Sequence, residues 1–350
     1  MERVLILGGG FVGRRLAALL AAAGAAPVCA SRSAGSGWGL PGVIEQVCDA
    51  TDPGAVAAAV AEADAVVNCV GGTPETMRAA ARALAAAPPR RIVHLSSMAV
   101  YGAATGRVAE ATPPEGRLGP YAAAKLAAEA LLREQAGDRV VILRPGCIYG
   151  PGSQQWTERI GRLLQQGRIG DLGPAGDGWA NLVHVDDVAA AIMAALRPES
   201  PGGAVFNLAA PDSPRWNTYF VRFGCLIGAA PVPRIGAARL GLERLLAPPL
   251  AVGARFGLSS APEPITPSLS RLWQQDIRLD AARATVALGL RWKPLGAGMV
   301  EAACWFRRVR PGQLHATKTC DGIRWPETAF ETAQKGGSER CGCAKTALCP

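Results

Sequence analysis

The glycine-rich turn near the N-terminus is the feature that most constrains how this chain can fold. An apolar strand-like run precedes the turn and a helical run follows it, and the turn itself reads Gly8-Gly9-Gly10-Phe11-Val12-Gly13. Gly8 permits a tight turn, Gly10 lets the backbone approach a pyrophosphate, and Gly13 allows close packing of the helix on the strand. The helix N-terminus then faces the anion with free N–H groups. The turn, with Phe11 and Val12 between its last glycines, therefore predicts a dinucleotide-binding site.

The residues that end the next strand-like runs bear on the choice of dinucleotide. Arg32 stands where an NAD-preferring site normally carries an acid for the ribose 2′-hydroxyl. A guanidinium binds a 2′-phosphate through two parallel hydrogen bonds, so we expect the cofactor to be NADP, bound by Arg32 with help from Arg14. If Arg32 only faces solvent, NAD is the alternative. Asp49 either accepts from the adenine amino group or caps the turn after it. Asn68 ends the fourth run, at an edge expected to lie against the cofactor.

The alternation of strand-like and helical runs predicts the fold class. It continues as far as Arg91-Ile-Val-His-Leu-Ser-Ser97 and is typical of a parallel, doubly wound sheet. We therefore expect an α/β protein with a Rossmann-like sheet and a smaller, mostly helical C-terminal lobe that binds the substrate. The expected NAD(P)-binding domain is 1–150, with 183–210 returning to the sheet. The expected lobe is 151–182 and 211–310, and a disordered tail is expected over 311–350.

A tyrosine and a lysine four residues apart form a candidate proton switch. Pro120 is well placed at a helix start and alanines follow it, so Tyr121 and Lys125 share one helix face. An unperturbed phenol titrates near ~10, and lowering that by about three units takes roughly 4 kcal/mol. A cation about 4 Å away at an effective dielectric near ~20 supplies that much. The same spacing also occurs on ordinary amphipathic helices.

With these motifs in this order, the chain resembles the extended short-chain dehydrogenase/reductase superfamily, in its NAD-dependent epimerase/dehydratase family. The resemblance rests on the glycine turn, the Tyr-x-x-x-Lys pair and three further runs: Ser96-Ser-Met-Ala-Val-Tyr-Gly102, Leu143-Arg-Pro-Gly-Cys-Ile-Tyr-Gly-Pro-Gly152 and Asn181-Leu-Val-His-Val-Asp-Asp-Val-Ala189. It implies that Tyr121 is the general acid/base. Lys125 would lower the pKa of Tyr121 and hold the nicotinamide ribose, and Ser97 would orient the substrate oxygen. Hydride would pass between the nicotinamide ring and a carbon bearing a hydroxyl or carbonyl.

Three departures from the family pattern affect the expected substrate. Leu7 stands where the family's first turn glycine is usual, Cys147 where many nucleotide-sugar enzymes carry Asn, and Ala180-Asn181 where they carry Arg-Asp. The last two weaken the case for a nucleotide sugar. We therefore expect NADPH-linked reduction of a carbonyl, or oxidation of the corresponding secondary alcohol. The alternatives are a nucleotide-sugar epimerase or dehydratase with retained NAD, and a non-catalytic NADP-binding scaffold, against which the intact catalytic residues speak.

The second lobe carries no motif that identifies its substrate. Candidates to line the substrate site come from both lobe segments and from the end of the first domain: Cys147, Trp156, Asn181, Trp216, Asn217, Arg234 and Trp273. The apolar stretch at 237–249 suggests a bulky, apolar substrate. His184 and the acid pair after it are interpreted as structural, with His184 in a strand and an acid capping the helix 188–196.

Composition sets the remaining expectations. The net charge is +9, but no basic stripe is interleaved with aromatics, so nucleic acid is not expected as a partner; the charge either suits an anionic ligand or has no particular role. The cysteines lack metal-ligand spacing, no metal is expected, and reduced thiols fit a cytoplasmic protein. No apolar run is long enough for a membrane span. The expected partner is a small-molecule substrate, and a homodimer is common among the proteins that the chain resembles.

Overall fold

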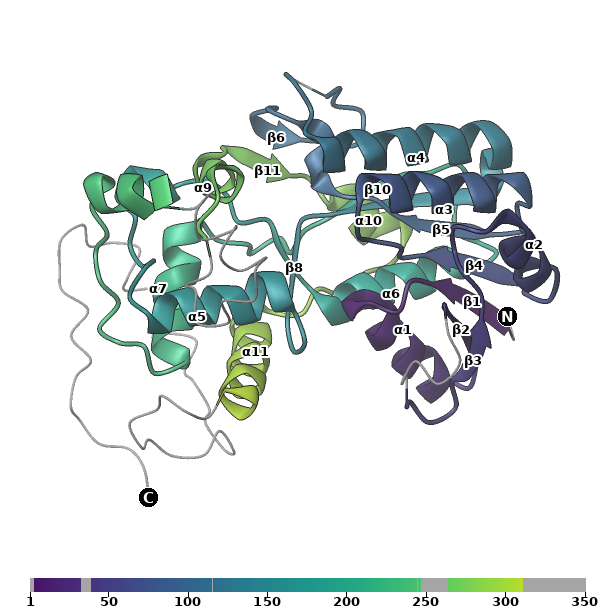
Figure 1. Cartoon of the computed structure of the whole chain (residues 1–350), viewed down its shortest axis with the longest axis horizontal. Helices are drawn as coiled ribbons and strands as arrows, with labels where there is room; N and C mark the ends of the chain where they lie inside the picture. The colour runs from purple at the N-terminus through teal and green to yellow at the C-terminus, as the bar shows by residue number, and fades with distance from the viewer. Residues whose placement is uncertain (1–2, 33–38, 115, 244, 247–263, 311–350) are drawn as a thin grey trace.

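The computed structural model describes residues 3–32, 39–114, 116–243, 245–246 and 264–310. At the centre of the fold is a seven-stranded sheet in the order β10-β7-β5-β4-β1-β2-β3, in which every neighbouring pair is parallel (Figure 1). The strands are β1 (Arg3–Leu7), β2 (Ala26–Ser31), β3 (Ile44–Val47), β4 (Ala65–Asn68), β5 (Ile92–Leu95), β7 (Val140–Pro145) and β10 (Val205–Leu208). The expected Rossmann-like, doubly wound sheet is confirmed.

Helices cover both faces of this sheet. They are α1 (Phe11–Ala22), α2 (Pro53–Ala61), α3 (Pro74–Ala86), α4 (Pro120–Ala136), α6 (Val185–Leu196) and α10 (Ala282–Ala287). Successive side chains of a strand point to opposite faces, so Val4 and Ile6 of β1 pack with α1 and α6, whereas Leu5 and Leu7 pack with α2, α3 and α4. The two layers lie on either side of the strands in Figure 1. This sandwich fixes the edge of the sheet at which the strands end.

The C-terminal lobe is built from helices around an aromatic core. Its helices are α5 (Arg159–Gln165), α7 (Trp216–Leu226), α9 (Pro267–Gln274) and α11 (Leu295–Val309). The core holds Trp216, Tyr219, Phe220, Trp273 and Phe306, each fully buried. Large aromatic side chains bury much apolar area each, which lets a small lobe form a core of its own.

Short elements connect the lobe to the sheet. Two parallel pairs form small sheets: β8 (Cys147–Tyr149) with β9 (Leu182–His184), and β6 (Gly106–Val108) with β11 (Ile277–Leu279). Short turns of 3₁₀ or π helix complete the fold: η1 (Met98–Tyr101), η2 (Gly137–Arg139), η3 (Gln154–Glu158) and η4 (Gly173–Gly176). Both small sheets pair a strand from the first 150 residues with a later one, so the lobe is anchored beside the carboxyl ends of the main strands.

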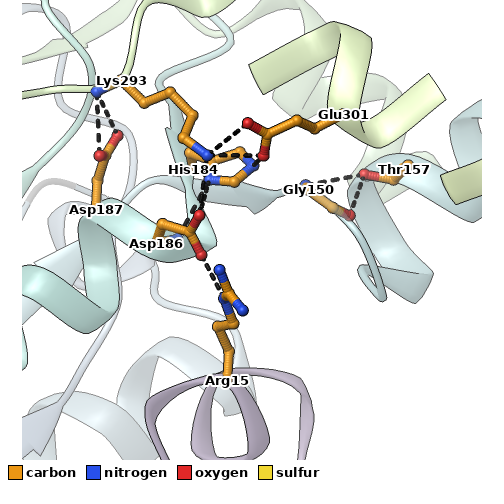
Figure 2. A network of polar contacts seen from close by, with 8 residues as sticks. All are labelled: Arg15, Gly150, Thr157, His184, Asp186, Asp187, Lys293 and Glu301. Atoms are coloured by element: carbon orange, nitrogen blue, oxygen red, sulfur yellow. Dashed lines mark hydrogen bonds and ion pairs between the residues drawn. The ribbon is translucent and has the colours of Figure 1, made fainter. Parts of the chain in front are cut away.

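A charged network joins the lobe to the helices under the sheet (Figure 2). The Asp186 carboxylate accepts from Arg15 Nε of α1 at 2.5 Å and from Lys293 Nζ at 2.9 Å. Lys293 also donates to Glu301 of α11, at 2.7 Å. His184 caps α6 through its Nδ1, which accepts from the Asp186 N–H at 3.3 Å. The expected acid cap is therefore wrong: the histidine caps the helix, and the acid forms ion pairs.

Two expectations concern residues at or beyond the limits of the described chain. The expected tail over 311–350 lies outside the described residues. Of the apolar stretch at 237–249, residues 244 and 247–249 also lie outside them. Leu242, Leu245 and Leu246 are exposed. Among the described residues, no helix is both apolar enough and long enough to cross a bilayer.

Candidate active site

The glycine turn is shaped by close backbone approaches. Gly8 has φ +108°, and a Cβ atom there would lie 2.7 Å from the Cys69 carbonyl carbon. A Cβ atom on Gly13 would lie 2.1 Å from the Gly8 carbonyl oxygen. A Cβ atom on Gly10 would meet nothing within 4 Å, and Gly10 is an N-cap without a side-chain hydrogen bond. The turn therefore leaves open space and free N–H groups at the start of α1, as an anion site requires.

A cleft of about 1940 Å³ runs from this turn to the lobe. The residues that line it include Gly10 and Phe11 of the turn, then Ser97, Tyr121 and Lys125, and from the lobe Trp156 and residues of α9. The lining residues come from the ends of β1, β4, β5 and β7, because parallel strands end at one edge of the sheet. The three residues of the expected triad thus lie in one cavity with the glycine turn.

Ser97 and Tyr121 line the same cleft. Ser97 follows β5 and caps η1, with its Oγ accepting from the Ala99 N–H at 3.2 Å. Tyr121 lies in the first turn of α4 and is 45% exposed, into the cleft. The cleft walls remove water from the phenol, so desolvation raises the pKa of Tyr121, and a hydrogen bond to Ser97 only partly opposes this. The expected lowering of this pKa by Lys125 is not found in the structure.

Lys125 is held from behind by the backbone. Its ammonium donates to the Leu95 carbonyl at 2.7 Å and to the Val70 carbonyl at 3.3 Å, and the residue is 4% exposed. Desolvation lowers the pKa of Lys125 to about 8. The two carbonyls belong to β5 and to the turn after β4. The two carbonyls therefore fix the position of one cation in the cleft that Tyr121 and the glycine turn also line.

Of the candidate substrate contacts, two lie in the cleft. Cys147 is buried, lines the cleft near Tyr121, and has its pKa raised by burial. Trp156 lines the lobe side and packs on Trp216, with ring centroids 5.4 Å apart. Trp216 and Trp273 themselves are fully buried in the lobe core. Aromatic residues of the lobe are thus mostly core, and Trp156 alone among these three reaches the cleft.

Asn181, Asn217 and Arg234 hold the lobe together and do not line the cleft. Asn181, with φ +44°, holds β11 in place: its side chain donates to the Ile277 carbonyl at 2.7 Å and accepts from the Leu279 N–H at 2.9 Å. It also borders a separate cavity of about 490 Å³. Asn217 donates to the Gly173 carbonyl. Arg234 pairs with Asp171 at 2.7 Å. These partners occupy the side-chain amides of Asn181 and Asn217, and none of the three residues lines the cleft.

The remaining cofactor candidates have local roles. Val12 packs in the core under the sheet. Asn68 is buried, and its Oδ1 accepts from the Val70 N–H at 3.1 Å, which shapes the turn that holds Lys125. Asp49 accepts from the N–H and hydroxyl of Thr51, which lowers its pKa. Of the two interpretations of Asp49, the contact within the turn is the one found in the structure. Arg32 is exposed just after β2, near the Asp49 carboxylate.

A buried ion pair behind the cleft was missed at the sequence level. Glu129, one helical turn beyond Lys125, accepts from Arg144 of β7 at 2.6 Å and from the Ser96 hydroxyl at 2.5 Å. Arg144 also donates to the Tyr101 hydroxyl at 3.0 Å. The pair ties α4 to the ends of β5 and β7. The four-residue step from Lys125 to Glu129 was the available signal, because both then face the sheet.

Three cations of the cleft, Arg78, Arg117 and Arg271, were also missed. Among the described residues, five cations line the cleft against one acid, Asp276; the cations are Arg14, Arg78, Arg117, Lys125 and Arg271. Such a cavity attracts anionic ligands.

One cluster outside the cleft has metal-ligand residue types. His184, Asp186 and Glu301 place one ligand atom each within 4.8 Å of one another. The Lys293 ammonium lies within hydrogen-bonding distance of both carboxylates, as Figure 2 shows, and supplies the cation there. The cluster therefore belongs to the joint between lobe and sheet.

Comparisons with known proteins show which family this chain resembles in sequence. A model described as "NAD dependent epimerase/dehydratase family" matches residues 4–209. Over 229 residues the chain is 32% identical to 2-alkyl-3-oxoalkanoate reductase of Stenotrophomonas maltophilia, covering 58% of this chain and 68% of that protein. It is 34% identical to Protein YeeZ of Escherichia coli over 144 residues, 40% of this chain and only 47% of that relative.

Solved structures show the same fold at lower identity. MoeE5 in complex with UDP-glucose and NAD aligns with a TM-score of 0.65 and 23% identity, over 88% of this chain and 99% of that one.

Proposed function

Because the chain belongs to the NAD dependent epimerase/dehydratase family, whose model matches residues 4–209, we propose that it is an NADP(H)-dependent oxidoreductase acting on a secondary alcohol or its ketone. The observation that carries this proposal is the shared cavity. Ser97, Tyr121 and Lys125 line the same cleft as Gly10. The substrate lobe is taken as 151–182 and 211–310.

The residues present fit a dinucleotide. The open space beside Gly10, the free N–H groups of α1 and the cation of Arg14 suit a pyrophosphate. Lys125 would hold the nicotinamide ribose. The exposed Arg32 at the end of β2 favours a 2′-phosphate, and so NADP over NAD. When bound, the cofactor supplies or accepts the hydride.

The chain's own residues would manage the proton. Ser97 donates a hydrogen bond to the substrate oxygen and holds the carbonyl in line with Tyr121. Tyr121 then gives its phenolic proton to that oxygen in the direction of reduction, and takes it back in oxidation. Desolvation by the cleft walls raises the pKa of the phenol, which suits the acid that reduction needs. The Lys125 ammonium stabilises the phenolate that remains, from a position fixed by the Leu95 and Val70 carbonyls.

A second candidate is a nucleotide-sugar epimerase that retains NAD. The cleft volume of about 1940 Å³ and its excess of arginines favour it, since both suit a large anionic substrate beside the cofactor. The 2-alkyl-3-oxoalkanoate reductase of S. maltophilia supports the reductase instead, as the relative with the longer matched segment. A non-catalytic scaffold has no need of three intact catalytic residues.

The reductase and epimerase proposals differ in cofactor turnover. We expect the purified protein to carry no bound NAD and to consume NADPH when given a ketone, monitored by absorbance at the reduced-nicotinamide band. Denaturing the protein and assaying the supernatant for released NAD is the companion measurement. Released NAD in stoichiometric amount, with no net NADPH consumption for any ketone, would support the epimerase and contradict the reductase.

A further inference from the structure

We propose that the smaller cavity beside Asn181, of about 490 Å³, is a second ligand site, and that it binds a carboxylate on an apolar body through Arg278. None of the described residues that line this cavity also lines the cleft of Tyr121. The site is therefore independent of the proposed hydride chemistry. Three features carry the proposal: an apolar floor, one unbalanced guanidinium, and an aromatic ring that holds that guanidinium.

Small apolar side chains form the floor of the cavity. Ala209 and Ala210 follow β10, and both are buried. Ala281 and Ala282 lie at the start of α10, next to the buried Leu279 of β11. Because an alanine side chain ends at Cβ, the segments that meet here leave space between them. A cavity of this volume and lining is in the range of sites that bind small organic molecules.

Val286 of α10 extends the apolar lining to the rim. It lines the cavity and is 83% exposed, whereas Ala284 of the same helix is buried in the core under the sheet. An apolar ligand in the cavity would cover part of the Val286 side chain and remove it from water, which favours binding. The apolar body of the ligand is therefore expected between α10 and the alanine floor.

The charged residues of the lining leave one positive charge unbalanced. Asp280 accepts from Arg107 Nε at 3.0 Å, and its other carboxylate oxygen accepts from the Ala282 N–H at 3.0 Å. These contacts neutralise Arg107 and use both oxygens of the acid. Among the described lining residues no other acid occurs, and Arg278 has no ion pair within the described part of the chain. The cavity thus suits a ligand with a single negative charge.

Trp179 holds Arg278 in place without using its hydrogen-bond donors. Both residues line the cavity, and Arg278 Cζ lies over the Trp179 ring, 4.5 Å from its centroid. A cation held by the face of an aromatic ring forms no conventional hydrogen bond there, so its N–H groups remain able to donate. A guanidinium can then bind a carboxylate through two parallel hydrogen bonds.

The backbone that carries Trp179 is itself fixed. Residues 178–180 pair with residues 214–216 through two backbone hydrogen bonds, of 2.9 and 3.1 Å. The guanidinium of Arg215, in the second of these segments, also lies over the Trp179 ring, 4.8 Å from its centroid. The ring that holds Arg278 is therefore preorganised, which reduces the entropy lost when a ligand binds.

The strand β11 leads from the cleft to this cavity, at the junction between the lobe and the sheet half (Figure 1). Gln275 and Asp276, just before the strand, line the cleft, whereas Arg278 and Leu279 line the cavity. A ligand that entered only the cleft would not contact Arg278. Substitution of Arg278 therefore separates binding in the cavity from binding in the cleft.

The test compares a charged ligand with its neutral analogue on the full chain. Naphthalene-2-carboxylate and 2-naphthamide are titrated calorimetrically into the protein, with and without NADPH. The variants are Arg278→Gln, Arg278→Lys and Trp179→Leu. The control is Arg133→Gln, an exposed arginine of α4 that lines neither cavity. Thermal unfolding without ligand checks that each variant is folded.

We expect the wild type to bind the carboxylate about tenfold more tightly than the amide, since a hydrogen bond to a charged group contributes this much or more. Arg278→Gln should lower the carboxylate affinity to that of the amide and leave the amide affinity unchanged. Arg278→Lys should keep part of the difference, Trp179→Leu should weaken binding of both ligands, and Arg133→Gln should change neither. The carboxylate should also raise the unfolding temperature of the wild type and not that of Arg278→Gln.

The proposal is overturned if the wild type binds neither ligand, or binds both equally well. It is equally overturned if Arg278→Gln leaves the carboxylate affinity unchanged, because the ligand then binds elsewhere. Failure of the proposed function looks different: NADPH would not bind, or no ketone would be reduced. The titrations without NADPH need neither event, so they still decide whether Arg278 binds a carboxylate.

Discussion

The sheet half and the helical lobe use their residues in opposite ways. In the sheet half the functional groups sit on short, local motifs: the turn at Gly8–Gly13, Ser97 after β5, and Tyr121 and Lys125 one helical turn apart. In the lobe the cleft-facing groups, Arg271 and Trp156, lie on helices whose other faces form the core. A motif can be recognised in a sequence, whereas the free face of a helix is defined only by what the rest of the lobe covers.

This difference suggests that the sheet half and the lobe have separate roles in the reaction. The sheet half would determine whether hydride and proton move at all, and the lobe would determine which molecule is held in place. Substitutions in the sheet half should then lower turnover or cofactor affinity, while those in the lobe should change substrate affinity alone. The predictions below test this separation.

The largest effect is expected for Tyr121→Phe. Removing the phenolic proton should lower kcat by about 10³-fold, the size of a general acid contribution. NADPH affinity, measured by fluorescence titration, should be unchanged, because Lys125 keeps its bonds to Leu95 and Val70. Trp156→Phe in the lobe is the matched variant and should affect KM more than kcat. Turnover retained in Tyr121→Phe would remove the tyrosine from the mechanism.

The next prediction compares the loss of unfolding free energy when a buried ion pair and an exposed ion pair are broken. Arg144 and Glu129 have side chains 7% and 2% exposed, so Arg144→Met leaves a buried charge and should cost about 3–5 kcal/mol of unfolding free energy. Arg234 and Asp171 of the lobe are 69% and 34% exposed, so Arg234→Met should cost less than about 1 kcal/mol. Urea unfolding measures both.

Arg234→Met also checks the corrected role of this arginine. Substrate KM should be unchanged, because Arg234 does not line the cleft. A raised KM without loss of stability would restore it as a substrate contact.

Two glycines offer a matched test of packing. A Cβ atom on Gly13 would lie 2.1 Å from the Gly8 oxygen, and one on Gly161 of the lobe would lie 2.5 Å from the Phe306 ring. Alanine at either position should destabilise the protein by about 1–3 kcal/mol. Only Gly13→Ala should also weaken NADPH binding, because only Gly13 shapes the cofactor turn. Equal loss of NADPH affinity in both would show that the two regions are not separable.

A change in cofactor preference is expected for Arg32→Asp. Replacing a guanidinium by a carboxylate should reduce the preference for NADPH over NADH by about tenfold, since a bidentate bond is exchanged for a repulsion. Arg90→Asp, an exposed arginine before β5, is the control. Separate titrations with NADPH and NADH give the ratio; a wild type that prefers NADH would contradict the assignment of NADP.

The sequence by itself determined the sheet, its glycine turn and the three residues expected to act together. These follow from local patterns: strand and helix periods, the backbone freedom of glycine, and the four-residue helical step. It did not indicate where Asn181 and Arg234 lie relative to the cleft, since an isolated polar residue looks the same whether it binds a ligand or a neighbouring strand.

Only the tertiary structure decided which polar groups remain available. The fold uses Asn181 to hold β11, buries Glu129 against Arg144, caps α6 with His184, and leaves Arg271 and Arg117 facing the cleft. Hydrogen bonds and ion pairs between residues far apart in the chain are formed only when the chain is packed. A side chain's partner, and therefore its freedom to bind a ligand, depends on that packing and not on its neighbours in sequence.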